Sequence, residues 1–338
     1  MEEKEVVLEG KSVSVGYASK LRRNMVHASL DFKLCRGELV CLLGANGVGK
    51  STLLRTLAAM QPSLGGNIML QNRPLDAYTD KERSKLIGVV LTSHTQAGGL
   101  TVRELVSLGR QPYTGFLGHL RQVDEEKIDN ALRAVGMFGK SCCYVAQLSD
   151  GERQKAMIAK VLVQECPLVL LDEPTAFLDI VSRLEILSLL HRLAVEEKRA
   201  ILLSTHDVEQ ALSLSDKLWL LSETEGLRCG VTEDLVLSHA MDTLFPHSDI
   251  RFDMLRGGYS PVLHGRQVLL TSSSEVLAHW ARNALNRNGW NCVPASLGLE
   301  CPHVDVRSAT ELHGICNGTM EHFTSFAQLI EWLRRVNC

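Results

Sequence analysis

The sequence predicts an α/β protein in which a parallel sheet is joined to an antiparallel one. Residues 26–34 (VHASLDFKL) alternate between apolar and polar side chains, the pattern of an antiparallel strand with one face in water. Continuous apolar runs, which favour parallel strands buried on both faces, occur at residues 39–43, 168–171 and 201–203. Helical patterns lie between these runs, for example at residues 103–109, 125–135 and 152–163. We therefore expect helices to cover a mostly parallel sheet, with an antiparallel subsheet beside it.

Composition limits the class of protein. The chain has 338 residues, of which 45% are hydrophobic, enough for one large domain or two unequal ones with a packed core. The net charge is −3 without a long basic run, so we expect no nucleic-acid partner. The ten cysteines form no CxxC pair, and we expect free thiols in a reducing compartment.

Nothing in the sequence predicts a membrane span or a signal peptide. No apolar stretch reaches the roughly 18 residues that a span needs. The first residues, MEEKEVVLEGK, carry charges where a signal peptide has an apolar core. We expect a cytosolic chain that reaches a membrane only through a partner.

The pattern changes after about residue 248. Residues 272–289 predict an amphipathic helix whose apolar face holds residues 276, 277, 280, 281, 284 and 285. Asn317-Gly318 between short apolar segments predicts a type I′ hairpin, and residues 325–336 predict a final helix. This part of the chain also holds several histidines and cysteines at irregular spacing, which favours scattered residues over a metal site: Cys301, His303, His313, Cys316 and His322.

A glycine-rich segment predicts a phosphate-binding loop. Residues 44–52 (GANGVGKST), here called the phosphate loop, fit G-x-x-x-x-G-K-[ST] between a buried strand and a helical pattern. Lys50 is expected to reach the terminal phosphates of a nucleotide and Ser51 to supply a hydroxyl to Mg²⁺. The residues predicted to line the nucleotide are Gly44, Ala45, Asn46, Gly47, Val48, Gly49, Lys50, Ser51 and Thr52.

Two carboxylates follow a buried strand in residues 168–173 (LVLLDE). Asp172 is placed to hold Mg²⁺, directly or through water, and Glu173 to orient or deprotonate a hydrolytic water. An acidic strand end is common by itself. Its pairing with the phosphate loop makes nucleotide hydrolysis the favoured interpretation.

A second anion-binding geometry occurs at residues 148–154 (LSDGERQ), where Ser149 and the backbone of Gly151 open a helix. One chain therefore carries two half-sites for a nucleotide, the phosphate loop and this second turn. If these half-sites cannot meet within a chain, two chains must pair head to tail, with each nucleotide between them.

The ordered motifs resemble those of the ATP-binding cassette (ABC) family over about residues 5–247. LSDGE resembles the family's signature LSGGQ, with Asp150 and Glu152 in place of glycine and glutamine. The resemblance implies that these signature residues contact the partner's nucleotide: Ser149, Asp150, Gly151 and Glu152.

Three further residues take roles from the same resemblance. Asp179, which ends PTAFLD, matches the aspartate that faces the partner subunit. His206 in LLSTHD matches the histidine that contacts the γ-phosphate, and Tyr17 in VSVGY matches the aromatic residue that stacks on adenine. With Lys50 and Glu173, His206 completes the predicted catalytic set.

The resemblance implies a P-loop NTPase fold of ABC type at residues 5–247, with a RecA-like core, an antiparallel β subdomain and an α-helical subdomain. Residues 248–338 are then a C-terminal α+β extension of unknown role. It also implies an ATPase that uses ATP and Mg²⁺, works as a homodimer and binds membrane permease subunits. A periplasmic or surface solute-binding protein is an indirect partner, and the ATPase lies on the cytoplasmic face of the membrane through the permease.

Residues 100–118 (LTVRELVSLGRQPYTGFLG) resemble the helical subdomain of importer ATPases for iron–siderophore, haem and cobalamin chelates, which carry a GRxPxxG stretch. An iron-chelate importer is therefore the favoured interpretation. An ABC transporter for another solute, or a soluble ABC ATPase outside transport, remains open.

The stretch at residues 88–99 (GVVLTSHTQAGG) departs from the family pattern. The family has a glutamine after this strand that touches Mg²⁺ and the hydrolytic water. Its position falls at or near Thr92, which we expect to contact the metal's water, and Ser93 and Gln96 remain alternatives.

Overall fold

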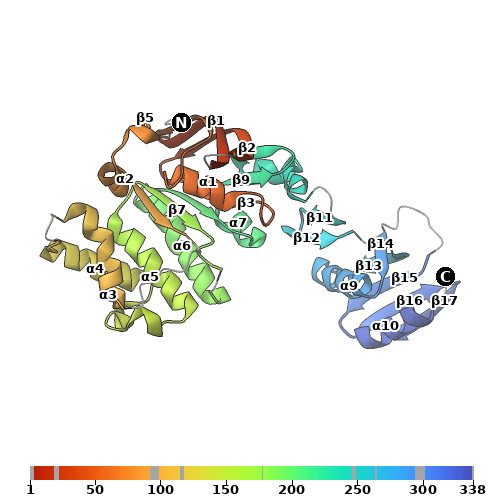
Figure 1. Cartoon of the computed structure of the whole chain (residues 1–338). Helices are drawn as coiled ribbons and strands as arrows, with labels where there is room; N and C mark the ends of the chain where they lie inside the picture. The colour runs from red at the N-terminus through yellow and green to blue at the C-terminus, as the bar shows by residue number, and fades with distance from the viewer. Residues whose placement is uncertain are drawn as a thin grey trace. The chain divides into compact units, whose positions relative to one another are not determined.

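The structure is a computed structural model that describes residues 4–18, 23–91, 99–114, 118–176, 178–245, 249–262, 265–293 and 301–336 (Figure 1). The chain divides into two compact units, residues 1–259 and 260–338. The predicted domain boundary at 247/248 lies on residues outside those described and stays a prediction. In the described ranges, no helix has both the length and the apolar character needed to cross a bilayer.

A six-stranded, mostly parallel sheet forms the centre of the first unit, in the order β10-β9-β3-β8-β7-β6. Its strands are β3 (Leu39–Leu43), β6 (Ile87–Val90), β7 (Leu168–Asp172), β8 (Ala200–Ser204), β9 (Lys217–Ser222) and β10 (Gly226–Val231). Strand β3 pairs in parallel with β8 and β9, and only the β9–β10 pair is antiparallel among the described pairings of this sheet. The three apolar runs are therefore confirmed as parallel strands.

A four-stranded antiparallel sheet has the order β2-β1-β4-β5. Its strands are β1 (Val6–Ala18), β2 (Arg23–Cys35), β4 (Gly65–Leu70) and β5 (Arg73–Pro74). The predicted antiparallel strand is confirmed, but its alternation is wrong before residue 30. Ser29 has φ +55° and the pairing with β1 shifts register between Val13 and Val15, so His27 is buried while Ala28 is exposed.

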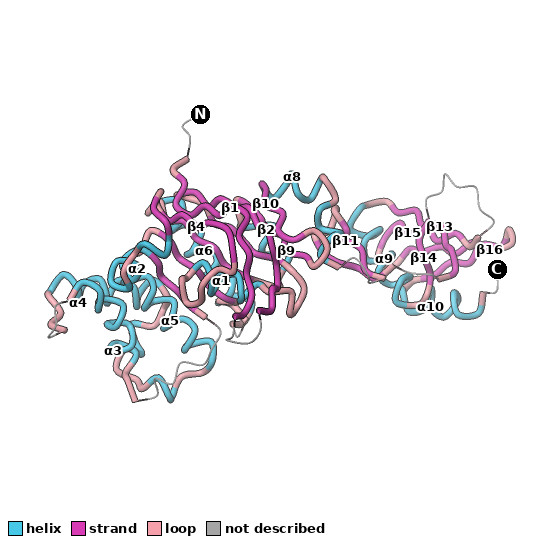
Figure 2. Tube along the Cα trace, turned by 45° about the horizontal axis from the view of Figure 1, so that its top comes forward, coloured by secondary structure: helices cyan, strands magenta, loops and turns pink. Residues whose placement is uncertain are grey.

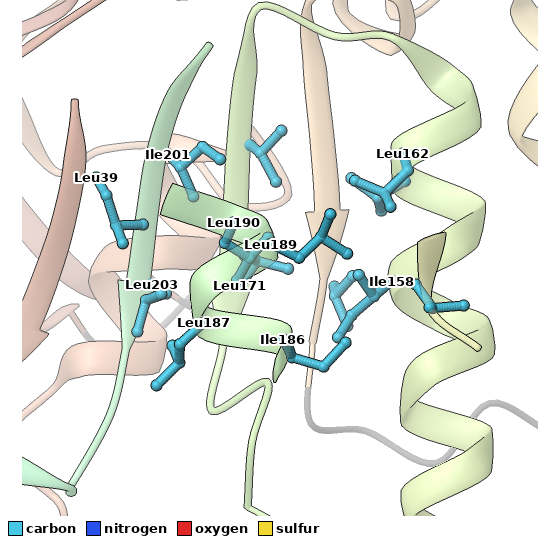
Figure 3. Close-up of a cluster of buried hydrophobic side chains, with 14 of the residues drawn as sticks. Leu39, Ile158, Leu162, Leu171, Ile186, Leu187, Leu189, Leu190, Ile201 and Leu203 are labelled. Carbon is cyan, nitrogen blue, oxygen red and sulfur yellow. The ribbon is translucent and has the colours of Figure 1, made fainter. Parts of the chain in front are cut away.

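Both faces of the parallel sheet are covered, because alternate residues of each strand enter different cores. Leu39, for example, belongs to the core on the face covered by α5 (Asp150–Gln164) and α6 (Ile180–Glu196), whereas Val40 faces α1 (Lys50–Leu57) and the antiparallel sheet. Figure 3 shows Ile158 of α5 and Ile186 of α6 against the strands on the first of these faces. This layering leaves the carboxyl ends of the strands available for a site.

A helical subdomain is built on α5 together with α3 (Val102–Ser107) and α4 (Gln122–Ala134), as Figure 2 shows. The predicted helices are confirmed. In the GRxP stretch, a Cβ on Gly109 would lie 2.2 Å from the carbonyl oxygen of Lys160, so only glycine lets this segment pack on α5. Arg110 is buried and donates to Asp124 at 2.8 Å and to the carbonyl oxygen of Val163 at 2.9 Å.

Shorter elements complete the first unit. The helices are α2 (Asp80–Leu86), α7 (Val208–Leu214) and α8 (Thr232–Leu237), with 3₁₀ turns at Leu75–Ala77, Leu108–Tyr113, Phe138–Lys140, Val145–Gln147 and Ala240–Leu244. Strands β11 (Ile250–Asp253) and β12 (Gly258–Pro261) form a two-stranded sheet, and the last two residues of β12 lie beyond the unit boundary at residue 259.

The second unit is a two-layer α/β fold with its own core. Its sheet has the order β14-β13-β15-β16-β17, with β13 (Arg266–Ser272), β14 (Trp290–Val293), β15 (His303–Ser308), β16 (Glu311–Cys316) and β17 (Thr319–Phe323). Residues of α9 (Glu275–Arg287) and α10 (Phe326–Arg335) pack on one face of this sheet.

Sequence predictions for the second unit hold in most respects. Both helices are confirmed, and the hairpin turn at Asn317 and Gly318 has φ +50° and +76°, as a type I′ turn requires. The predicted apolar face of α9 is too wide, since Val276 and Trp280 are exposed. Cys316 is disulfide-bonded, so the expectation of free thiols is wrong for this residue.

Candidate nucleotide-binding site

The phosphate loop joins β3 to the start of α1 and takes the conformation that its glycines allow. Gly47 and Gly49 have φ +81° and +111°, in the left-handed region that residues with a Cβ rarely adopt. Gly49 is the N-cap of α1 and no side chain caps this helix, so its first backbone N–H groups are free of a side-chain cap, as in helix N-termini that bind anions.

Lys50 lies folded over the phosphate loop. Its ammonium group donates to the carbonyl oxygens of Gly44 at 2.7 Å and Ala45 at 3.1 Å. Burial lowers the pKa of Lys50, while the nearby carboxylates of Glu173 and Asp172 act in the opposite direction. The structure thus brings the predicted lysine and both predicted carboxylates into one electrostatic neighbourhood.

Two side chains of the antiparallel sheet support the phosphate loop. The ring of His27 donates from Nε2 to the carbonyl oxygen of Val48 at 2.6 Å, and a Cβ on Gly49 would lie 3.3 Å from that ring. The hydroxyl of Tyr17 lies 2.8 Å from Oγ1 of Thr52, and Tyr17 itself is 49% exposed. Its ring is therefore accessible at the edge of the loop, where the family resemblance implies that adenine stacks.

The end of strand β7 carries both predicted carboxylates, and the end of β8 lies beside it. Asp172 is 1% exposed, and its Oδ1 accepts a hydrogen bond from the hydroxyl of Ser204 at 2.7 Å. Glu173 follows with φ +48°, a left-handed conformation for a residue with a Cβ, and its N–H donates to the same hydroxyl at 3.0 Å. Ser204 is a polar residue of this site that the sequence analysis missed.

His206 lies just after β8 with its side chain 57% exposed. Its Nδ1 is 3.7 Å from Oε2 of Glu173, beyond hydrogen-bond distance but close enough for the two groups to act on one ligand. The structure therefore places the predicted histidine beside the predicted catalytic glutamate.

The signature turn, residues 148–152, caps α5. The hydroxyl of Ser149 accepts the N–H of Glu152 at 3.3 Å, and the Glu152 carboxylate accepts the N–H of Ser149 at 3.1 Å. Both of its unusual acidic residues are paired, Asp150 with Arg153 and Glu152 with Lys140. The Lys140 ammonium group is the main cause that lowers the pKa of Glu152.

Within the described part of the chain, no hydrogen bond or ion pair links the signature turn to the phosphate loop. Asp179 is the N-cap of α6 and accepts the N–H of Ser182 at 2.8 Å, which is the first cause of its lowered pKa. The residues proposed to replace the family glutamine, Thr92, Ser93 and Gln96, lie outside the described residues.

Comparison with known proteins gives a consistent result. Residues 28–176 match the family model described as ABC transporter. The chain is 36% identical over 255 residues to the petrobactin import ATP-binding protein FpuC of Bacillus anthracis, covering 75% of this chain and 92% of that protein. It is 33% identical over 238 residues to the ferric enterobactin transport ATP-binding protein FepC of Escherichia coli (strain K12), covering 70% and 86%.

Among solved structures, a similar fold occurs in CbiO1 of Clostridium perfringens, part of the ABC transporter complex CbiONQ. The TM-score is 0.60 at 26% identity, with 71% of this chain and 96% of that chain covered. The residues matched by the family model include the phosphate loop, the signature turn and both carboxylates of β7.

Proposed function

The chain belongs to the ATP-binding proteins of ABC transporters, and from this premise we propose that it powers the uptake of an iron–siderophore, haem or cobalamin-type chelate through a membrane permease. ATP hydrolysis is general to this family. The observation that carries the catalytic part of the proposal is the approach of Lys50, Asp172, Glu173 and His206 to one edge of the sheet.

The phosphate loop is proposed to hold the phosphates of ATP. Its backbone N–H groups and the positive end of α1 favour an anion, and Lys50 would exchange its carbonyl partners for phosphate oxygens. Tyr17 would stack on the adenine from the rim of the loop. These contacts bind the nucleotide and leave its terminal phosphate toward the carboxylates of β7.

The available donors fit Mg²⁺. This ion prefers hard oxygen ligands, and the site offers the buried carboxylate of Asp172, to which Ser51, the second residue of α1, would add its hydroxyl. When bound, the ion would neutralise charge on the phosphate oxygens. The proposed third contact, Thr92, lies outside the described residues.

The proposed hydrolytic step uses Glu173 and His206. The Glu173 carboxylate would orient the attacking water and accept its proton, while His206 would donate a hydrogen bond to the γ-phosphate. With the two groups 3.7 Å apart, a water held by Glu173 would lie beside a phosphate oxygen held by His206.

We propose that two copies of the chain enclose each nucleotide between the phosphate loop of one and the signature turn of the other. The support is that each chain has both half-sites and that the described contacts do not join them. Binding of ATP would close the dimer and hydrolysis would reopen it, since only the closed state contacts the γ-phosphate from both sides. Asp179 would face the partner copy.

The importer assignment rests on relatives named for petrobactin import and ferric enterobactin transport. The GRxP stretch supports it. Gly109 and Arg110 hold this stretch against α5, and in this family the same segment meets the permease. Through that permease the chain would lie at the inner face of the membrane, with a solute-binding protein as an indirect partner.

The test is co-purification with a multi-span permease followed by uptake of candidate chelates into proteoliposomes. A Glu173→Gln variant should bind ATP, lose hydrolysis and stop uptake. Hydrolysis by this variant at the wild-type rate would overturn the catalytic assignment. Uptake of an unrelated solute, or ATPase activity with no permease partner, would instead favour another transporter or a soluble ABC ATPase.

A further inference from the structure

The hydroxyl of Ser204 connects the two acidic residues at the end of β7. Ser204 is the last residue of β8, lies opposite Asp172 in the parallel register and is fully buried. Its Oγ donates to Oδ1 of Asp172 at 2.7 Å and accepts the N–H of Glu173 at 3.0 Å. One side chain thus contacts the carboxylate of one residue and the backbone of the next.

The bond to Asp172 fixes the direction of a buried charge. A carboxylate that is 1% exposed needs donors close by, because it has lost most of its hydration. A hydroxyl has one proton to donate, and here the proton goes to the carboxylate, which leaves the lone pairs of Oγ for the N–H of Glu173. The proton given to Asp172 therefore sets the direction from which the hydroxyl oxygen accepts the N–H of Glu173.

The bond to Glu173 stabilises an unfavourable backbone conformation. Glu173 has φ +48°, a region that side chains with a Cβ seldom occupy, and the surrounding structure must hold such a residue in place. This turn sets where the Glu173 carboxylate points as the chain leaves β7. The same carboxylate lies 3.7 Å from Nδ1 of His206.

We propose that Ser204 is a positioning residue for ATP hydrolysis, which holds Asp172 toward the metal and Glu173 toward the attacking water through one hydroxyl. This inference rests on the roles proposed above for Asp172 and Glu173. Ser204 itself contacts neither substrate nor metal in the proposal, so its effect should fall on turnover rather than on nucleotide binding.

The test compares Ser204→Thr with Ser204→Val, two side chains of nearly equal shape that differ by one hydroxyl. Ser204→Val should lower kcat about tenfold or more with KM for ATP nearly unchanged, because a displaced catalytic group costs turnover. It should also weaken the binding of Mg²⁺ to the complex with a non-hydrolysable ATP analogue, measured by calorimetric titration. Ser204→Thr should restore most of kcat and the normal Mg²⁺ affinity.

Ser204→Ala removes the hydroxyl without adding volume and is the second variant if the larger side chains disturb folding. Thr232→Val, on α8, is the matched control, since it deletes a buried hydroxyl that donates to the carbonyl oxygen of Ser215 at 2.9 Å. We expect its kcat and Mg²⁺ affinity to match those of the wild type.

Wild-type kcat in Ser204→Ala would overturn the inference, whatever Ser204→Val and Ser204→Thr show, because the hydroxyl would then be dispensable. A rise in KM at constant kcat would do the same. Glu173→Gln in the same assay separates the proposed role of Glu173 from the inference about Ser204. If that variant hydrolyses ATP normally, the proposed role of Glu173 fails; if it is inactive while Ser204→Ala is fully active, only the inference about Ser204 fails.

Discussion

The Nε2 atom of His27 lies 2.6 Å from the carbonyl oxygen of Val48 and supports the phosphate loop from the antiparallel sheet. A β-bulge at Ser29 turns this histidine inward. Deleting a buried hydrogen bond costs about 1–3 kcal/mol, so His27→Leu should weaken ATP binding roughly tenfold. Titration with a fluorescent ATP analogue measures this change.

The control for this prediction is His191→Gln on α6, a histidine outside the loop and its supports. We expect wild-type ATP affinity from it. Unchanged ATP affinity in a folded His27→Leu protein would show that the loop holds its shape without this hydrogen bond.

Arg110 and Asp124 form an ion pair that is almost entirely withdrawn from water, with side chains 6% and 10% exposed. Arg110→Leu would leave the Asp124 carboxylate buried without this partner, which costs about 3–5 kcal/mol. Chemical denaturation should show the loss. The matched control is Arg103→Leu, whose ion pairs with Glu125 and Asp129 are more exposed, and there we expect no more than about 1 kcal/mol.

If the double variant Arg110→Leu/Asp124→Leu recovers part of the lost stability, the unpaired carboxylate is the cause. Equal destabilisation by Arg110→Leu and Arg103→Leu would contradict the special role of the buried pair.

Asp124 also predicts a pH dependence. The N–H of Arg121 lowers the pKa of Asp124 and the Arg110 guanidinium adds to this, so the folded state holds its proton less tightly than the unfolded state. The resulting stability is present above the unfolded pKa of about 3.9 and is lost as pH falls through the folded pKa. In unfolding experiments between about pH 2 and 7, the difference between wild type and Asp124→Asn should shrink below about pH 4. Parallel curves across this range would rule the effect out.

The signature turn carries two carboxylates where an anionic phosphate is expected. Lys140 pairs with Glu152 and offsets one of these charges. In the Glu173→Gln background, Lys140→Met should weaken ATP-driven dimer formation about threefold to tenfold, because a net negative charge then faces the phosphate. Size-exclusion chromatography against ATP concentration measures the effect.

Lys140→Met/Glu152→Gln should recover dimer formation, since both charges are removed together. The control is Lys127→Met, which breaks an ion pair with Glu165 in the same helical subdomain and should leave dimer formation unchanged. Failure of the double variant to recover would mean that Lys140 acts through something other than charge.

The parts of the fold that follow local patterns were predictable. Apolar runs predict the strands of the parallel sheet, and Asn317-Gly318 predicts the turn between β16 and β17, because buried strands and type I′ turns depend mainly on neighbouring residues. The bulge at Ser29 was not predictable in this way, since it depends on how β2 pairs with β1. The inward position of His27 follows from that bulge.

The site shows the same division. Two sequence motifs predict Lys50, Asp172 and Glu173 as site residues without any structure. Ser204 is identified only through the parallel register that sets it opposite Asp172, although a serine ending the apolar run AILLS is a detectable signal. In the sequence Arg110 is only part of a family motif, and the structure shows that it is buried against Asp124.

The central position of β3 has a consequence for how the protein is made. Leu39 pairs with Ile201 and Val40 with Lys217, so the strand that leads into the phosphate loop emerges from the ribosome long before its partners. At about 5 to 20 residues per second, this strand waits roughly 10 to 35 s for them. Nucleotide can therefore stabilise the nascent chain only late in translation, and during that interval the apolar strand depends on the antiparallel sheet or a chaperone for cover.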